Sequence, residues 1–253
     1  MKVMSFNLLC GGKGERDWPC RVPPVVETIR REAPDTLGVQ EAHSGWMDAL
    51  CAALPEYDYV GVGREDGKRD GEFSAVFYRK ELFLLVDSGN FWLSETPEKP
   101  SKGWDAACTR ICSYAVLEER ASGRRFVHFN THMDHIGQTA MCEGGKLIAA
   151  RSLALKEYPS IFTGDFNVEP DHPAYQTVIG AGFRDAGVIC GVQHGQKTYH
   201  GFECPDRDSW AEIDYIFLRG DITATDYRVV TDKVDGKLPS DHYPVTAQIE
   251  FTR

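Results

Sequence analysis

The chain has 253 residues, 42% of them hydrophobic, and carries a formal net charge of −10 at pH 7. This length and apolar content allow a sizeable core, and we expect a single domain over residues 1–253. So acidic a charge argues against a protein that grips DNA or RNA through a broad basic surface. An anionic substrate is still compatible with it, provided that a metal ion and a few arginines supply local positive charge.

Eight cysteines occur singly, without a CxxC pair. We therefore expect reduced thiols that mostly fill the core, although the sequence is also compatible with a disulfide. Residues 2–7 show no signal-peptide core, and no apolar run approaches the length that spans a membrane. These features predict a cytoplasmic protein without membrane association, and we expect a monomer.

Two apolar runs near the N-terminus predict strands that end on polar side chains. In residues 3–9, Asn7 is embedded in the run. A buried amide needs hydrogen-bond partners, so Asn7 either caps the strand end or serves a site. Residues 36–39 lead into Gln40 and Glu41. A carboxylate at the end of an apolar strand must be paired or bound to a metal, unless it faces solvent at the start of a loop.

The rest of the chain alternates between further strands and a smaller number of helices. The proline pair at 23–24 predicts a helix from Pro23 to Arg31, because proline favours the first helical turn. Other helices are expected at 45–54, 144–157 and 171–179, and other strands at 57–62, 73–78, 82–86, 89–94, 108–117, 125–132, 211–218 and 245–251. The long polar segment 95–107 is typical of a functional or mobile loop.

Residues 163–167, Thr-Gly-Asp-Phe-Asn, end a buried strand on Asp165 and Asn167. Side chains two residues apart in an extended chain project on the same side. Asp165 and Asn167 can therefore point together at one metal-bound water or one phosphate. The alternative is an Asx turn that closes the strand, since both residue types hydrogen-bond their own backbone.

Histidines and further acidic side chains occur on other predicted strands. His128 lies in the middle of its strand and is expected to pack in the core, whereas His132, at the strand end, is the better catalytic candidate. Asp214 lies on an apolar strand, where it needs a cation, an imidazole or amide donors. Asp241 and His242 come just before the last strand.

Together these side chains supply the parts for metal-assisted attack of water on a phosphate ester. Hard oxygen ligands suit Mg²⁺ or Mn²⁺ far better than zinc. The histidines, without an obvious Cys or Ser nucleophile, indicate acid–base catalysis. Arg110 can clamp a phosphate through its guanidinium fork. The candidate oxygen donors are Asn7, Glu41, Asp165, Asn167 and Asp241.

These motifs, in this order, resemble the endonuclease/exonuclease/phosphatase superfamily. That group includes DNase I, apurinic endonucleases, inositol-polyphosphate 5-phosphatases, sphingomyelinases and deadenylase-type nucleases. The resemblance covers essentially the whole chain, and segments 91–97, 103–105 and 198–202 look most like a bacterial branch related to the deadenylase-type members. It is carried by Asn7, Gln40-Glu41, Arg110, Thr131-His132, Gly164–Asn167, Ile213–Tyr215 and Ser240–Val245.

The resemblance implies a four-layer α/β sandwich, in which two mixed β-sheets pack face to face with helices outside and the site at one end. It implies Mg²⁺, with Mn²⁺ as a substitute, held chiefly by Glu41 with Asn7 and Asp241 close by. Asp165 would orient or deprotonate the attacking water, and Asn167 would help to hold the phosphate.

The resemblance also assigns roles around the phosphate. His242, oriented by a carboxylate, would stabilise the charge that develops on the phosphoryl oxygen. Asp214 would be the partner of His132. Tyr78 and Arg110 occupy positions where the family often places phosphate-contacting groups.

The sequence thus predicts a Mg²⁺-dependent phosphoesterase that hydrolyses a phosphodiester or phosphomonoester. Its substrate would be compact: a nucleic-acid end, a nucleotide derivative, or a phosphorylated sugar or lipid head. A nuclease or deadenylase-like exonuclease is the second interpretation, although basic loops for gripping a duplex are not evident. A non-catalytic module that binds a phosphate ligand is the third. Loop chemistry should decide among substrates, in residues 64–71, 95–107, 135–145 and 193–208.

Overall fold

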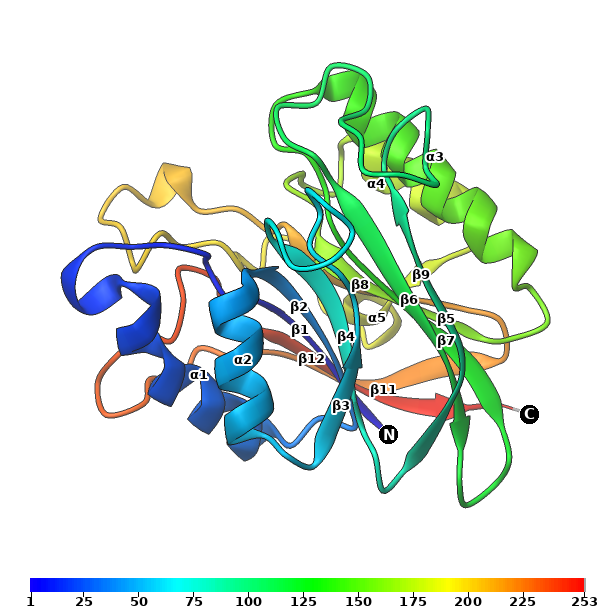
Figure 1. Cartoon of the computed structure of the whole chain (residues 1–253), viewed down its shortest axis with the longest axis horizontal. Helices are drawn as coiled ribbons and strands as arrows, with labels where there is room; N and C mark the ends of the chain where they lie inside the picture. Colours follow the sequence, from blue (N-terminus) through cyan, green and yellow to red (C-terminus); the bar gives the residue numbers. More distant parts are fainter. Residues whose placement is uncertain (253) are drawn as a thin grey trace.

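The computed structural model describes residues 1–252, which form two six-stranded β-sheets with helices around them (Figure 1). The first sheet consists, in spatial order, of β11 (Ile222–Val229), β12 (Val245–Phe251), β1 (Lys2–Asn7), β2 (Thr36–Ala42), β4 (Phe73–Arg79) and β3 (Tyr57–Val60). The second consists of β5 (Phe83–Trp92), β6 (Ile111–Glu119), β7 (Arg125–His132), β8 (Ser160–Asp165), β10 (Asp214–Arg219) and β9 (Arg184–Asp185). The helices are α1 (Trp18–Glu32), α2 (Ser44–Ala53), α3 (Gln138–Ala154), α4 (Pro173–Gly180) and α5 (Ala186–Ile189), with short 3-10 turns η1 (Gly14–Arg16) and η2 (Arg207–Ser209).

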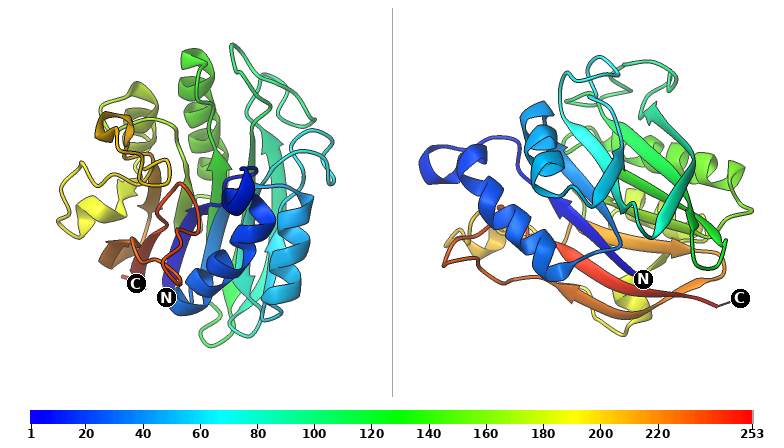
Figure 2. Two further views of the ribbon diagram at one scale, coloured as in Figure 1. Left: turned by 90° about the vertical axis from the view of Figure 1, so that its left-hand side faces the viewer. Right: turned by 60° about the horizontal axis from the view of Figure 1, so that its bottom comes forward.

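Both sheets are mixed, because β1–β2 and β7–β8 pair in parallel whereas β1–β12 and β8–β10 pair antiparallel. Helices α1 and α2 cover the outer face of the first sheet, and α3 and α4 cover that of the second (Figures 1 and 2). The predicted four-layer α/β sandwich is confirmed.

The two-residue repeat of the strands sorts their side chains into three apolar layers. On β1, Met4 and Phe6 pack with the helices outside the first sheet, whereas Val3 joins the cluster between the sheets. On β8, Ile161 belongs to that same central cluster, and Phe162 packs outward with α3 and α4. Each central strand therefore buries both of its faces.

A polar network also crosses between the sheets. His128 is fully buried, as predicted, and its two ring nitrogens lie 2.8 Å from the hydroxyls of Thr36 on the first sheet and Thr163 on the second. Gln40 Nε2 donates across the layer to Asn130 Oδ1 at 2.7 Å. Burial lowers the pKa of His128 to about 3, so its ring is neutral. These bonds fix the register of one sheet against the other.

Helix α1 begins earlier than the sequence indicated. The Asp17 carboxylate accepts a hydrogen bond from the Trp18 N–H, and Pro19 occupies the first turn, so that Pro23 and Pro24 lie inside the helix. The prediction that the helix starts at Pro23 was wrong. Prolines occur at two places in this segment where a helix could start, and the capping aspartate precedes the first of them.

Other elements are longer than predicted. The expected strands at 82–86 and 89–94 are one strand, β5, with a bulge between Leu85 and Asp87. Helix α3 begins at Gln138, so most of the predicted loop 135–145 is helical. The start of α3 is capped by a residue from an earlier loop. The Asp105 carboxylate accepts hydrogen bonds from backbone N–H groups of the first turn. Strand β11 was not predicted.

All eight cysteines are free, in agreement with the predicted reduced thiols. Cys112 is buried, whereas Cys20 and Cys51 are exposed, so the expectation that most of them fill the core was wrong. Within residues 1–252, no helix combines the length and the apolar character that crossing a bilayer requires.

The topology brings the polar strand ends to one end of the sandwich. In the first sheet, the parallel pairing of β1 with β2 places Asn7 beside the residue that precedes Glu41. In the second sheet, His132 on β7 lies opposite Asp165 on β8, and Asp165 lies opposite Asp214 on β10. Side chains from five strands therefore converge.

Candidate active site

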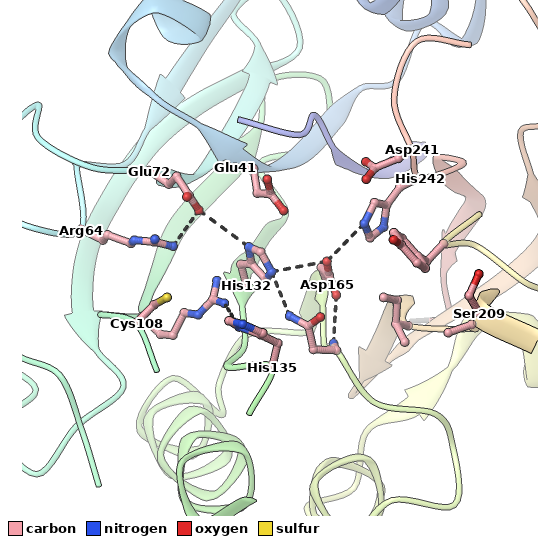
Figure 3. A pocket seen from close by; sticks show the side chains of 15 residues that line it. Glu41, Arg64, Glu72, Cys108, His132, His135, Asp165, Ser209, Asp241 and His242 are labelled. Carbon is pink, nitrogen blue, oxygen red and sulfur yellow. Dashed lines mark hydrogen bonds and ion pairs between the residues drawn. The ribbon is translucent and has the colours of Figure 1, made fainter. Parts of the chain in front are cut away.

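A cavity of about 520 Å³ opens where these strands end (Figure 3). Most of the predicted site residues line it: Glu41, Arg110, His132, Asp165, Asn167, Asp241 and His242. Two others, Asn7 and Asp214, lie behind this lining and contact it through hydrogen bonds.

Asn7 joins the carboxylates of the two sheets. Its Nδ2 donates to Glu41 Oε1 at 3.0 Å and to Asp165 Oδ2 at 2.8 Å. Its Oδ1 accepts from the Leu9 N–H at 2.9 Å. The Cys10 N–H donates to the second oxygen of Glu41 at 2.9 Å. Asn7 was predicted as a metal ligand; in the structure its amide nitrogen, rather than its oxygen, contacts the two carboxylates.

Three non-glycine residues around the site have a left-handed backbone: Leu9 (φ 56°), Glu41 (φ 59°) and Asn167 (φ 53°). Such a conformation costs about 1–3 kcal/mol per residue and persists only where surrounding contacts enforce it. At Glu41 and Asn167 it turns a functional side chain toward the cavity as the strand ends.

Asp165 and Asn167 point the same way, as the spacing predicted. The Asn167 N–H donates to Asp165 Oδ1 at 2.9 Å, which is the Asx turn that the sequence offered as the alternative. The Asx turn is therefore present, and it leaves both side chains in the cavity wall. Burial and the negative charge of Asp214 raise the pKa of Asp165 to about 7, although the His242 charge opposes them.

His132 is a neutral imidazole with a defined tautomer. Burial lowers its pKa well below the usual value, and the charges of Arg110 and Arg64 act in the same direction. Asn167 Nδ2 donates to the Met133 carbonyl at 3.0 Å and lies 2.9 Å from His132 Nε2, so this ring nitrogen accepts. The proton then resides on Nδ1.

The carboxylate on the Nδ1 side of the ring is Glu72, which no pattern in the sequence had indicated. Glu72 Oε2 lies 4.0 Å from His132 Nδ1 and 2.6 Å from Arg64 Nη1 (Figure 3). His132 Nδ1 has no hydrogen-bond partner among the described residues. Burial raises the pKa of Glu72, while the Arg64 charge opposes the increase.

Asp214 contacts His242, which corrects the predicted pairing of Asp214 with His132. Asp214 Oδ2 lies 2.9 Å from His242 Nδ1, and both side chains are buried. Burial alone would lower the pKa of His242, but the Asp214 carboxylate, together with the charges of Asp165 and Asp241, outweighs it and raises that pKa to about 10. His242 is therefore an imidazolium, with Nε2 at 3.8 Å from Asp165 Oδ2.

Arg110 lies immediately before β6 and is buried, with 5% of its surface exposed. Its Nη2 contacts His135 Nδ1 at 3.1 Å, and its Nε is 3.8 Å from Asp134 Oδ2. Its Nε and Nη1 have no hydrogen-bond partner in the described part of the chain. A buried guanidinium with free N–H groups in the cavity wall is suited to an anionic ligand.

Tyr78 does not belong to this site, so its predicted role was wrong. It pairs with Thr36 at the start of β2, and its side chain is in the core between the sheets. Thr36 is five residues before Glu41, a separation of about 16 Å along a strand. The tyrosine that does line the cavity is Tyr199, whose ring packs edge-on against His242 at 5.1 Å.

The donor groups in the cavity fit a hard divalent cation. One oxygen each of Glu41 and Asp165 and one His132 ring nitrogen lie within 4.8 Å of one another. Burial raises the pKa of Asp241, and the neighbouring Glu41 charge adds to this effect while His242 opposes it. At Glu41, burial is outweighed by the Cys10 N–H and the His242 charge, which lower its pKa. A concentration of carboxylates that repel one another is typical of an oxygen-ligand cation site.

The fold and the cavity together define a DNase I-like sandwich with a carboxylate, amide and imidazole site at one end. The sequence matches the Endonuclease/Exonuclease/phosphatase family over residues 4–242. The chain therefore belongs to this family, whose members hydrolyse phosphate esters.

Several solved structures and curated proteins are similar to this chain. A mannosyl-6-phosphatase of Bacteroides thetaiotaomicron is 37% identical with a TM-score of 0.92, and the match covers 99% of this chain and 100% of that one. A family member from Bacteroides vulgatus is 33% identical with a TM-score of 0.93, over 99% and 98% of the two chains. Nocturnin of Drosophila melanogaster is 22% identical over 208 residues, or 71% of this chain and 30% of nocturnin. The chain spans only 30% to 54% of the length of the curated relatives that it matches.

Proposed function

We propose that this protein is a Mg²⁺-dependent phosphoesterase that hydrolyses a phosphomonoester of a compact polar substrate, such as a sugar phosphate. The observation that carries the proposal is the meeting, in one cavity, of a carboxylate near neutral pKa (Asp165), an imidazolium (His242) and a neutral imidazole (His132). Water activation, charge stabilisation and proton transfer each need one of these groups.

Glu41 would hold the metal, with Asp241 close by and Asn7 orienting Glu41. When bound, Mg²⁺ would polarise the phosphoryl group and offset its negative charge. Mn²⁺ has the same preference for oxygen ligands and would serve as a substitute.

Asp165 would orient and deprotonate the attacking water. Its Oδ1 accepts from the Asn167 N–H and its Oδ2 accepts from Asn7 Nδ2. The water would donate to the remaining lone pair of Oδ2, because this oxygen lies between the two site histidines, 3.4 Å from His132 Nε2 and 3.8 Å from His242 Nε2. A pKa of about 7 suits a general base that works near neutral pH. Asn167, beside it, would hold a phosphoryl oxygen through its amide, exchanging its present bond to His132.

His242 would stabilise the charge that develops on the phosphoryl oxygens. Its Nδ1 is bonded to Asp214, so Nε2–H is the donor that faces the cavity. A fixed, charged donor in a buried site stabilises an oxyanion more strongly than the same group does in water. Arg110 would contact the phosphate through its free N–H groups.

His132 and Glu72 would act together near the leaving group. The Nδ1 proton of His132 points toward Glu72, so a small movement that closes the 4.0 Å separation would make a hydrogen bond. That bond would hold the ring and make Nε2, which Asn167 now occupies, a better proton acceptor. Nε2 would receive the proton that Asp165, 3.4 Å away, takes from the water, and would pass it to the leaving oxygen. Arg64 keeps the Glu72 carboxylate in place.

Three observations favour a small phosphomonoester over a polynucleotide. The cavity, at about 520 Å³, matches the size of sites for small ligands. The net charge of −10 disfavours a long polyanion. A related structure with 37% identity is a mannosyl-6-phosphatase, whereas the identity to nocturnin is only 22%.

The test is an activity screen with Mg²⁺ or with EDTA over hexose phosphates, bis-p-nitrophenyl phosphate, and single-stranded RNA and DNA. The variants Glu41→Ala and Asp165→Asn should lose activity by roughly 10²-fold or more, and Tyr78→Phe serves as the matched control outside the site. Mg²⁺-dependent release of phosphate from a hexose phosphate supports the proposal. If RNA or DNA is cleaved faster than the hexose phosphates, the substrate is a nucleic acid and the sugar-phosphate assignment is refuted. Activity that survives EDTA or both variants would refute the mechanism.

A further inference from the structure

Arg21 is a buried cation to which the proposed reaction gives no role. It lies on α1, and only 2% of its surface is exposed. Its guanidinium stacks 5.2 Å from the ring centre of Trp46 on α2. A buried charge is costly unless it is fully hydrogen-bonded, so the partners of Arg21 show what it holds together.

Within residues 1–252, its hydrogen-bond partners are five backbone carbonyls and no carboxylate. Nε donates to Arg16 O at 2.7 Å, and Nη2 donates to Leu9 O at 2.6 Å and to Gly11 O at 2.9 Å. Nη1 donates to Leu8 O and, at 3.2 Å, to Pro239 O. One side chain therefore ties the loop after β1 to the loop before β12.

Both loops carry groups of the site. In the first loop, the Leu9 N–H bonds Asn7 and the Cys10 N–H bonds Glu41. In the second, Pro239 is followed at once by Ser240 and Asp241, and Ser240 Oγ donates back to the Asn7 carbonyl at 2.8 Å. The distance between Glu41 and Asp241 thus depends on how these loops are joined.

Leu9 shows how much the first loop needs support. Its φ of 56° is unfavourable for a branched side chain, and its carbonyl accepts from both Arg21 Nη2 and, at 3.2 Å, Trp46 Nε1. These two donors hold the turn that presents the Cys10 N–H to Glu41.

We propose that Arg21 is a positioning residue that sets Glu41 and Asp241 at the separation required by the divalent cation. This inference rests on the proposed function, because it concerns the same metal site. Arg21 touches neither the metal nor the substrate: it acts through the Cys10 N–H on one carboxylate and through the Pro239 segment on the other.

The experiment measures Mg²⁺ affinity of metal-free protein by calorimetry and Mn²⁺ affinity by electron paramagnetic resonance. The variants are Arg21→Met, Arg21→Lys, which keeps the charge but not the fork, and Trp46→Phe, which removes one bond to Leu9. The control is Arg219→Met. Arg219 also stacks on an aromatic ring and donates to a backbone carbonyl (Ser152 O, 2.5 Å), but it pairs with Ser160 at the opposite end of β8 from Asp165.

We expect both Arg21 variants to weaken metal binding by about 10- to 100-fold, as other residues that support metal ligands do. Trp46→Phe should weaken it less, and Arg219→Met should leave it within about twofold. Saturating Mg²⁺ should restore most of kcat in Arg21→Lys, because the reacting groups are intact. Melting temperatures of the metal-free proteins report general loss of stability.

Wild-type metal affinity in both Arg21→Lys and Trp46→Phe would overturn the inference, as would equal weakening in Arg219→Met. If Arg21→Met does not fold, Arg21→Lys and Trp46→Phe decide the question. A wild-type protein that binds neither Mg²⁺ nor Mn²⁺ would instead refute the metal in the proposed function, and the inference with it.

Discussion

Replacing Asp214 with asparagine removes the carboxylate that keeps His242 charged. The two side chains are 2.9 Å apart and almost wholly buried. Asp214, with smaller contributions from the charges of Asp165 and Asp241, raises the pKa of His242 from 6.5 to about 10 against the effect of burial. That elevation corresponds to about 5 kcal/mol in favour of the imidazolium over the neutral ring. In Asp214→Asn the burial effect should prevail, so His242 should be neutral at pH 7.

The same pair makes stability depend on pH, with a definite sign. A group whose folded pKa lies above its unfolded value stabilises the protein fully below the unfolded pKa. For His242 this contribution is complete below about pH 6.5 and is lost as the pH rises toward about 10. The difference in unfolding free energy between wild type and Asp214→Asn should therefore be largest in mild acid and smallest near pH 10.

The assay is a nuclear magnetic resonance titration of the imidazole signals in metal-free protein, with kcat measured in parallel. We expect the wild-type His242 ring to stay protonated beyond pH 9 and kcat of Asp214→Asn at pH 7 to fall by roughly 10²–10³-fold. His128, buried between the sheets, should stay neutral in both proteins and serves as the internal control. A variant ring still charged at pH 8, or a change confined to His132, would refute the pairing.

Three further substitutions test other parts of the structure. Glu72→Gln should lower kcat about tenfold, because the negative charge 4.0 Å from His132 Nδ1 is lost, and steady-state kinetics measures this. Tyr78→Phe should leave kcat and KM within about twofold in the same assay, since Tyr78 lies in the core away from the cavity. A Cβ on Gly38 would lie 2.1 Å from the Thr163 hydroxyl, so Gly38→Ala should destabilise the protein by about 1–3 kcal/mol in urea unfolding. Gly180→Ala, where a Cβ meets nothing within 4 Å, is its control, and an equal loss in both would contradict the reasoning.

Much of the site was predictable because strand ends are visible in a sequence. An apolar run that stops on a polar side chain indicates both the strand and its functional end. This pattern identified Asn7, Glu41, His132 and Asp165, and the structure brings all four together. The two-sheet sandwich followed from the resemblance of these motifs to a family rather than from the pattern itself.

The pairing of Asp214 required information that the pattern does not contain. Asp214 is chemically able to pair with either His132 or His242, and the sequence does not say which of the two it contacts. The antiparallel register places Asp214 opposite Asp165, and His242 reaches it from the loop before β12. Only the three-dimensional arrangement of two separate segments decides which imidazole is charged.

Strand direction explains both the wrong assignment of Tyr78 and the omission of Glu72. Strand β4 runs antiparallel to β2, with Phe73 opposite Ala42 and Tyr78 opposite Thr36. Since Glu41 is at the end of β2, the site faces the beginning of β4, where Glu72 precedes the first strand residue. Tyr78, near the end of β4, therefore lies toward the end of the sandwich opposite the site. A sequence shows which residues could serve a phosphate ester, and the direction in which each strand runs decides which of them reach it.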